Sequence, residues 1–307
     1  MELPTLLPPR TKAAPHFKSI VDSKVSIILP VYNEESILEY NIKKISDFLD
    51  GVNINHELVI CDDNSNDNTH NVTKRLRFGD HNLVCLRFHQ RIGKGGTIRN
   101  ALQVASGEIL VFMDADLSTN LSHIPKLVKA VEKTKGLVIG VRNGAAKRSL
   151  SRLFLSIGYN HLVELMFRIG ISDTQCGFKG MSVEAAERLF QRVRCNGFLF
   201  DTELLVNARR LKIPITIMPV KWEDHRPKGA SKVVPFRTVV TMLADLIVLR
   251  LTRINGTEII KLKKVLNGLF VEQNRDDFHP TVDMVMDIGN KKLLSFLRRI
   301  YLKVAFD

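Results

Sequence analysis

Short apolar runs rich in β-branched residues alternate with segments of helical spacing through the first half of the chain, which narrows the possible folds sharply. Five runs follow one another, at residues 25–31, 57–61, 83–88, 109–113 and 137–141. Helices are expected from within 32–35 to about 49, after 65, over about 95–105 and over 122–133. Near-continuous apolar strands joined by helices indicate an α/β fold with a mainly parallel sheet flanked by helices. Ligands of such sheets bind at the carboxyl ends of the strands.

Composition excludes several classes of protein. With 307 residues, 45% of them hydrophobic, the chain has ample material for a core and is not a disordered or fibrous protein. No apolar run reaches the roughly 18 residues of a membrane span, and the N-terminal segment lacks the apolar centre of a secretory signal, so we expect a cytoplasmic location. The four cysteines are far apart without a CxxC pair, which favours reduced, buried thiols. A net charge of +13 calls for an acidic partner: nucleic acid, a phosphorylated ligand or an anionic membrane.

Two carboxylates, Asp114 and Asp116, come directly after the fourth apolar run. Alternate residues there point the same way, so the pair could share one divalent cation. Mg²⁺ and Mn²⁺ prefer oxygen ligands and complete their coordination with substrate phosphates and water. A polar turn with a helix cap is the alternative interpretation of two such aspartates. Their place at the end of a buried strand favours the metal site.

A second acidic cluster, residues 62–67, follows the second run and is expected at the same edge of the sheet. One of its carboxylates could accept hydrogen bonds from a base or ribose, and Tyr32, after the first run, could stack on a base. Asn64 or Ser65 could also cap the next helix, and capping is compatible with ligand binding.

Two basic segments could bind phosphate. The sequence from Arg91 to Gly96 opens a helix and resembles a phosphate-cradling loop, but it matches neither the Rossmann nor the P-loop pattern, which disfavours those cofactors; a simple helix-entry turn is the alternative. Residues 142–152 contain four cations and no acid. Arg148, Arg152 and Ser156 are spaced by four and share one face of a helix. Because this stripe begins just after the fifth run, phosphate binding is favoured over a solvated basic face.

Taken together and in this order, these motifs resemble family 2 glycosyltransferases, and within them the dolichyl- or polyprenyl-phosphate sugar synthases. The resemblance spans residues 25–251 and rests on seven segments: 30–35, 62–67, 93–96, 113–117, 140–142, 173–179 and 226–232. The sequence Asp-Thr-Gln-Cys-Gly-Phe-Lys at 173–179 is similar to the glucosyltransferase branch rather than to the mannosyltransferase branch.

The resemblance implies a GT-A fold and a role for each matching residue. Asp63 would contact the nucleotide base, with other donor-binding residues at Pro30, Tyr32, Glu34, Lys94 and Asp114. Asp114 and Asp116 would hold the metal and the donor diphosphate. The acceptor phosphate would be bound by Arg142, Arg152, Ser156 and Arg226. Catalysis would rest on Asp116, Arg142 and Lys232. Ser118 stands where mannosyl members often have Gln, which removes a candidate third metal ligand.

The implied reaction is an inverting transfer of a sugar from a nucleotide sugar, with UDP-glucose or another UDP-hexose favoured, to dolichyl or polyprenyl phosphate. A lipid monophosphate is largely a dianion at pH 7 and needs no general base. The protein then has to align two anionic substrates and stabilise the leaving diphosphate. Two alternatives within the family are a GDP-mannose-dependent dolichyl-phosphate mannosyltransferase and an enzyme acting on a carbohydrate hydroxyl, which would need a carboxylate base. A nucleic-acid-binding module is favoured only by the charge, because RNP, KH and zinc-finger patterns are missing; no nucleic-acid partner is expected.

We expect an N-terminal extension over 1–23, a catalytic domain over 24–235 and an amphipathic helical region over 236–307. Apolar residues at helical spacing between 236 and 251 are flanked by arginines, and 291–303 is basic and amphipathic. Such helices can lie in a membrane interface, which predicts peripheral association with the cytoplasmic face of a membrane. Packing of the first helix on the catalytic domain is the alternative.

Overall fold

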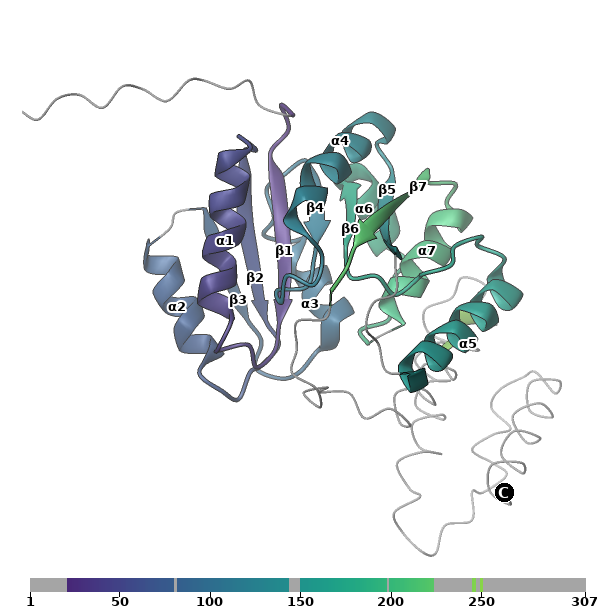
Figure 1. Cartoon of the computed structure of the whole chain (residues 1–307), viewed down its shortest axis with the longest axis horizontal. Coiled ribbons are helices and arrows are strands. Elements are labelled where there is room, and N and C mark those ends of the chain that lie inside the picture. Colours follow the sequence, from purple (N-terminus) through teal and green to yellow (C-terminus); the bar gives the residue numbers. More distant parts are fainter. Residues whose placement is uncertain are drawn as a thin grey trace, which may run out of the picture.

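The computed structural model describes residues 21–79, 82–143, 150–197, 199–223, 245–246 and 249–250. Within this part of the chain, a seven-stranded sheet forms the centre of the molecule, with strand order β3-β2-β1-β4-β6-β5-β7 (Figure 1). The strands are β1 (Val25–Val31), β2 (His56–Asp62), β3 (Leu83–Arg87), β4 (Ile109–Phe112), β5 (Leu137–Asn143), β6 (Lys179–Ser182) and β7 (Ile215–Lys221). The five predicted strands are therefore β1 to β5.

The sheet is mainly parallel, as the sequence predicts. β1 pairs in parallel with β2 and β4, β2 with β3, and β5 with β7. Only β6 runs the other way among these strands, antiparallel to both β4 and β5. Its first residue, Lys179, pairs with Phe112, the last residue of β4. The antiparallel strand thus brings a lysine to the edge at which the parallel strands end.

Helices cover both faces of the sheet, and two separate apolar clusters result. They are α1 (Leu38–Gly51), α2 (Thr69–Gly79), α3 (Gly93–Ala101), α4 (Ile124–Thr134), α5 (Leu150–Phe167), α6 (Val183–Phe190) and α7 (Phe200–Arg210). One cluster joins Ile27 and Leu29 of β1 to residues of α1, α2 and α4. The other joins Ile28, between them, to residues of α3, α5, α6 and α7. This alternation along a strand that is buried on both sides explains its near-continuous apolar sequence.

Helix α1 begins at Leu38, a few residues later than the polar segment 32–35 suggests. The backbone of Asn33 is left-handed, with φ of 55°. Its N–H donates to the Ser65 hydroxyl at 2.9 Å, and the Glu34 N–H donates to the Thr69 hydroxyl at 2.8 Å. These N–H groups bind the loop before α2 and the first residue of α2 instead of opening a helix. The loops after β1 and β2 are therefore tied together at the carboxyl edge of the sheet.

The described parts of the segment after 235 pack on the helices that cover the sheet. Leu246 and Leu249 belong to the apolar cluster of α6 and α7 and are buried. Arg210, at the end of α7, donates to the Leu249 carbonyl at 3.2 Å. Among the described residues, no helix combines the length and the apolar character needed to cross a bilayer. Most of the region 236–307 lies outside the described residues, so its docking on a membrane stays a prediction.

Candidate active site

The loop after β4 carries the two carboxylates predicted to hold a metal ion. β4 ends at Phe112, so Asp114 and Asp116 lie directly beyond its carboxyl end. Asp116 is oriented by Ser118, whose backbone N–H and hydroxyl donate to its Oδ1 at 3.0 and 2.6 Å. Asp114 is about half exposed, with 45% of its side chain accessible to solvent. The Ser118 hydroxyl is thus engaged in holding the second carboxylate.

A divalent cation fits this pair by the chemistry of its oxygen donors. Gly177 faces Asp114, and a Cβ on Gly177 would clash with both carboxylate oxygens. Glycine at this position leaves Asp114 where it is. Within the described part of the chain, no group of three or more His, Cys, Asp or Glu side chains surrounds one metal position. Two carboxylates suit a hard cation that takes its other ligands from substrate phosphates and water.

The residues predicted to bind the nucleotide base meet after β1 and β2. The carboxylate of Asp63 accepts hydrogen bonds from the N–H groups of Ile92 at 2.6 Å and Gly93 at 3.1 Å, which ties the acidic loop to the start of α3. Arg91 lies over the Tyr32 ring, 3.5 Å from its centroid, and its Nε is 3.6 Å from Asp63 Oδ2. The structure therefore brings Tyr32 and Asp63 together and adds Arg91, to which the sequence alone assigned no role of its own.

Two other predicted donor residues flank this cluster. Pro30 lies near the end of β1, opposite Cys61 of β2. Glu34 follows in the loop whose backbone is tied to Thr69. Both positions are at the carboxyl edge of the sheet, as the motif order predicts.

The glycines of the loop that opens α3 serve close backbone packing. A Cβ on Gly93, whose φ is +74°, would clash with the Asn196 carbonyl, and one on Gly95 would clash with the Cys195 carbonyl. The Gly95 N–H donates to the Asn196 carbonyl at 2.8 Å, and the Gly93 N–H is taken by Asp63. These two N–H groups therefore bond within the protein. The part of the loop that faces the site is the side chain of Lys94.

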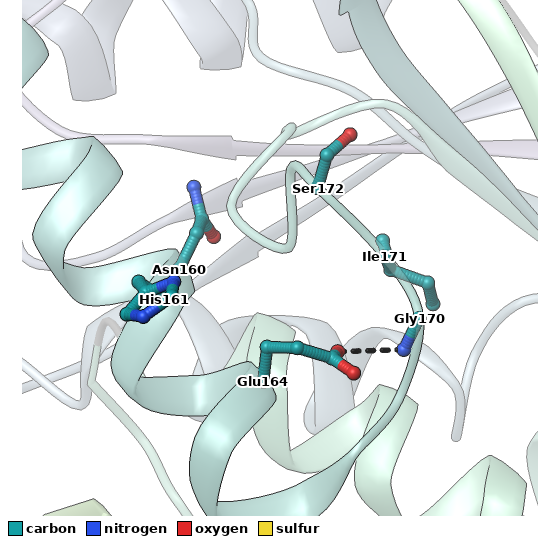
Figure 2. A pocket seen from close by; sticks show the side chains of 6 residues that line it. All are labelled: Asn160, His161, Glu164, Gly170, Ile171 and Ser172. Carbon is teal, nitrogen blue, oxygen red and sulfur yellow. Dashed lines mark hydrogen bonds between the residues drawn. The ribbon is translucent and has the colours of Figure 1, made fainter.

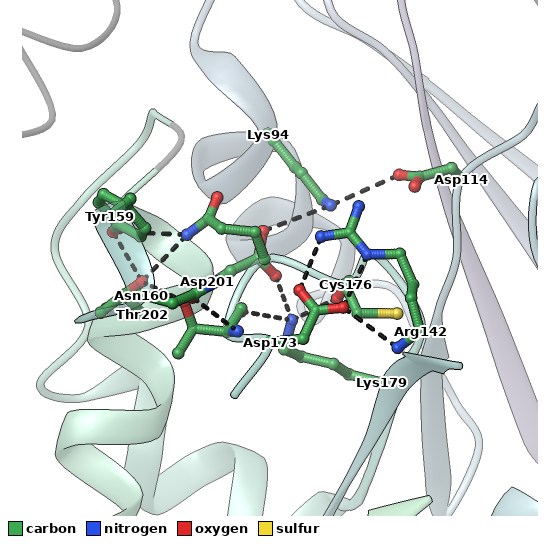
Figure 3. Close-up of polar contacts among 12 residues, drawn as sticks. Lys94, Asp114, Arg142, Tyr159, Asn160, Asp173, Cys176, Lys179, Asp201 and Thr202 are labelled. Atoms are coloured by element: carbon green, nitrogen blue, oxygen red, sulfur yellow. Dashed lines mark hydrogen bonds and ion pairs between the residues drawn. The ribbon is translucent and has the colours of Figure 1, made fainter. Parts of the chain in front are cut away.

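Lys94 lies between two carboxylates (Figure 3). Its Nζ is 3.4 Å from Asp114 Oδ1 and 3.5 Å from Asp201 Oδ2. Asp201 also binds Lys179, with 2.6 Å between Oδ1 and Nζ. Burial lowers the pKa of the Lys94 ammonium, but the two carboxylates more than offset that effect and hold the pKa above its ordinary value. Lys94 is therefore a permanent cation at the edge of the proposed metal site.

Arg142, predicted to bind the acceptor phosphate, is fixed by Asp173. Its Nε and Nη2 donate to the two oxygens of Asp173 at 2.7 and 2.6 Å, and its backbone N–H donates at 3.1 Å. The guanidinium also lies 5.4 Å from the Trp222 ring centroid. Burial raises the pKa of the Asp173 carboxyl. The hydrogen bonds and the charge of Arg142 lower that pKa by a larger amount, so it lies below its ordinary value. The family-like segment 173–179 thus contains the residue that orients Arg142.

The remaining predicted acceptor residues are not all placed. Arg152 and Ser156 lie one turn apart on α5, and their side chains are outside the described residues. Arg226 and Lys232 fall in the segment 224–244, also outside the described residues. Their roles stay predictions. The described end of α5 is joined to the site: the Tyr159 hydroxyl is 2.8 Å from that of Thr202 on α7.

A cleft of about 510 Å³ lies beside α5, next to the segment that carries Asp173 (Figure 2). The residues lining it are Asn160, His161, Glu164, Gly170, Ile171 and Ser172. Glu164 accepts a hydrogen bond from the Gly170 N–H at 2.7 Å across it. Asn160 accepts a hydrogen bond from the Thr174 hydroxyl at 3.1 Å, which links this side of the cleft to the loop that carries Asp173.

Comparison with solved structures confirms the fold. Glucosyl-3-phosphoglycerate synthase from Mycobacterium tuberculosis, in a complex with Mn²⁺, UDP and phosphoglyceric acid, superposes with a TM-score of 0.58. The match covers 76% of this chain and 81% of that one, at 22% sequence identity. The likeness is one of architecture, and that architecture is the GT-A fold.

Curated relatives match over a similar share of the chain at higher sequence identity. Dolichyl-phosphate beta-glucosyltransferase from Mus musculus is 32% identical, over 78% of this chain and 79% of that protein. The Homo sapiens protein of the same name is 31% identical over 81% and 82%. Glycosyltransferase AglD from Haloferax volcanii is 33% identical over 76% of this chain, which spans only 38% of that longer protein. Since the model of the glycosyl transferase family 2 also matches residues 26–190, this chain belongs to that family.

Proposed function

We propose that this chain transfers a hexose from a nucleotide sugar, with UDP-glucose favoured, to dolichyl or polyprenyl phosphate, with inversion at the sugar carbon. The names of the relatives at about 30% identity over most of the chain support the acceptor and the sugar. The M. tuberculosis neighbours were solved with UDP, UDP-glucose and Mn²⁺ or Mg²⁺, which supports a uridine nucleotide and a divalent cation. The acceptor places the reaction at a membrane surface, and the donor would arrive from the cytoplasmic side.

One structural observation carries the choice of a phosphate acceptor. Asp173 and Asp201, the buried carboxylates bound to Arg142 and to the two lysines of the site, are both ion-paired. Burial raises the pKa of Asp201, but Lys179 and Lys94 lower it below the ordinary value, as Arg142 does for Asp173. Carboxylates with lowered pKa values are weak general bases. A sugar hydroxyl acceptor would need an effective general base to remove its proton, whereas a phosphate dianion attacks without one.

The chain's own groups then have distinct tasks. Asp114 and Asp116 would hold the cation, which acts as a Lewis acid on the leaving diphosphate when bound. The Lys94 ammonium, beside Asp114, would neutralise charge on the same diphosphate. Asp173 takes the Nε–H and one N–H of Nη2 of Arg142, so the two N–H groups of Nη1 and the second N–H of Nη2 would donate to the acceptor phosphate. Donor and acceptor would thus be aligned between two fixed cations.

A donor and acceptor screen with the purified protein tests this proposal. Dolichyl phosphate is incubated with labelled UDP-glucose, UDP-galactose or GDP-mannose and Mn²⁺ or Mg²⁺, and label in the organic phase is counted. Dolichol without its phosphate is the matched control acceptor. We expect transfer from UDP-glucose to dolichyl phosphate and none to dolichol. Transfer from GDP-mannose alone would mean that the donor is GDP-mannose instead of UDP-glucose. Transfer only to a carbohydrate hydroxyl would overturn the proposed function.

A further inference from the structure

Lys179 is a lysine in the protein interior at the floor of the site. Its side chain is 1% exposed, although an unpaired buried ammonium is strongly unfavourable. It is stabilised by three acceptors: Asp201 Oδ1 at 2.6 Å and the backbone carbonyls of Thr174 and Cys176. An ammonium has three donors, so these acceptors satisfy it completely. Lys179 is therefore an internal support with no proton left for a substrate.

Asp201 is the link between this support and the surface. It is the second residue of α7, where the helix dipole favours a negative charge, and its side chain is 5% exposed. Its two oxygens are divided, since Oδ1 binds Lys179 and Oδ2 lies 3.5 Å from Lys94. Exposure rises along the series, from 1% for Lys179 to 22% for Lys94 and 45% for Asp114. The four charges alternate in sign from the core to the metal loop (Figure 3).

A second carboxylate behind Lys94 solves an electrostatic problem. A divalent cation at Asp114 would repel the Lys94 ammonium, and such repulsion is large where water is partly excluded. Asp201 offsets it and gives the ammonium a partner that the cation does not take. Lys179 in turn fixes Asp201, so that the carboxylate keeps one orientation. Without this pair the flexible Lys94 side chain would turn toward solvent or compete for Asp114.

We propose that Asp201, anchored by Lys179, is a positioning residue that holds the Lys94 ammonium beside the metal-binding carboxylate Asp114, in contact range of the donor diphosphate. It touches neither substrate and acts through Lys94. This rests on the proposed function, because it takes the donor to be a nucleotide diphosphate sugar. The competing explanation is that Lys179 and Asp201 only join β6 to α7 and contribute stability.

Three changes separate the two explanations. D201N alone leaves Lys179 as an unpaired buried charge and could fail to fold, so K179M/D201N removes both charges together. K94M removes the ammonium that Asp201 is proposed to hold, and K94M combined with K179M/D201N completes a mutant cycle. E57Q is the matched control, since it breaks a Lys–Glu pair whose carboxylate is buried at the opposite edge of the sheet. For each variant, thermal unfolding, UDP affinity in the presence of Mn²⁺, kcat and KM are measured.

We expect K179M/D201N to fold, to bind UDP with Mn²⁺ about tenfold more weakly and to lose about a hundredfold in kcat. K94M should show the same pattern, and the combined variant should be no worse than K94M. E57Q should lose stability and keep both kcat and UDP affinity. A folded K179M/D201N with wild-type kcat and affinity would overturn the proposal. So would losses that multiply in the combined variant, because they would show that the groups act independently.

The binding measurement also separates this proposal from the proposed function. UDP affinity with Mn²⁺ requires no lipid acceptor. If the wild-type protein binds UDP with Mn²⁺ but transfers no sugar to dolichyl phosphate, the proposed function fails while the affinity of K179M/D201N still decides the role of Asp201.

Discussion

Two lysine–carboxylate clusters lie at opposite edges of the same sheet. They differ in how many of the hydrogen bonds that each carboxylate can accept are made within the protein. At the amino edge, Glu57 accepts four hydrogen bonds, from the Lys24 ammonium at 2.8 Å and from the Ser26 hydroxyl, Ser106 hydroxyl and Ser106 N–H, each at 2.6 Å. At the carboxyl edge, the Asp114 carboxylate is 45% exposed, and its contact with Lys94 is long, at 3.4 Å.

The difference separates structural charge from charge available to a ligand. A carboxylate whose oxygens are filled by short internal bonds can only contribute to the fold. A carboxylate that is half exposed, with only a long contact to a lysine, can still bind a metal ion that carries a diphosphate. Buried charge therefore marks both clusters, but of these two described clusters only the one at the carboxyl edge has the open groups that a ligand needs. The following changes test that contrast, from the largest expected effect to the smallest.

Replacing the fixed metal carboxylate should have the largest effect. In D116A the Ser118 hydrogen bonds lose their acceptor, and the cation proposed to bind there would lose a ligand. We expect transfer to fall by about a thousandfold or more, with the melting temperature little changed. Rates with saturating Mn²⁺ and circular dichroism check this. Near wild-type transfer by D116A would show that the metal site lies elsewhere.

Loosening Arg142 should have the next largest effect. In D173N the bidentate ion pair becomes a weaker contact to a neutral amide, and the guanidinium loses its fixed direction. We expect about a hundredfold loss in kcat/KM for dolichyl phosphate. Affinity for UDP with Mn²⁺ should stay unchanged, because Arg142 and Asp173 are proposed to act on the acceptor phosphate and not on the donor. A loss confined to UDP affinity would assign Arg142 to the donor instead.

These two residues also show what a sequence can reveal of such a site. Asp116 is predictable because it directly follows an apolar run and has a partner two positions away. Asp173 and Asp201 act through cations at 142, 94 and 179, and pairings of this kind are created only when the chain folds. Asp201 by itself looks like an ordinary acid at a helix start.

The strands of the sheet also differ in how far the sequence predicts them. β1 to β5 are near-continuous apolar runs, so both the strands and the parallel sheet follow from the sequence. β6 is a four-residue strand that starts with Lys179 and contains Gly180. Its sequence lacks the run of β-branched residues that predicts the other strands. It becomes a strand because β4 and β5 pair with it on both sides.

A small change beside Asp114 should weaken the metal site without removing a ligand. The Cβ introduced by G177A would clash with both oxygens of Asp114 and force the carboxylate to move. We expect about a tenfold loss of Mn²⁺ affinity in the presence of UDP. Isothermal titration measures it, with Gly197 as the control position, because a Cβ there meets no atom within 4 Å. Equal affinities of G177A and G197A would contradict the close fit of Gly177 to Asp114.

Breaking the cluster at the amino edge should change stability and leave catalysis alone. Burial raises the pKa of Glu57, but hydrogen bonds from Lys24, Ser106 and Ser26 lower it to about 2, from an ordinary value of 4.5. A carboxyl with a lowered folded pKa stabilises the protein above its unfolded pKa, and this contribution is lost as the pH falls through the folded value. We expect E57Q to cost about 1–3 kcal/mol at pH 7, where the buried donors lose a charged acceptor.

The pH dependence makes this last change a specific test. The stability difference between wild type and E57Q should be constant above about pH 5, shrink between pH 4.5 and 2, and vanish below that. E39Q is the matched control, because the pair of Glu39 and Arg75 is more than half exposed and should contribute little at any pH. Chemical denaturation at a series of pH values measures both differences. The kcat of E57Q at pH 7 should equal that of the wild type, since Glu57 lies at the edge of the sheet away from Asp114. A fall in kcat would show that the two clusters are coupled through the sheet and would remove the distinction between them. A stability difference that persists unchanged to pH 2 would show that Glu57 does not stabilise the fold through its charge.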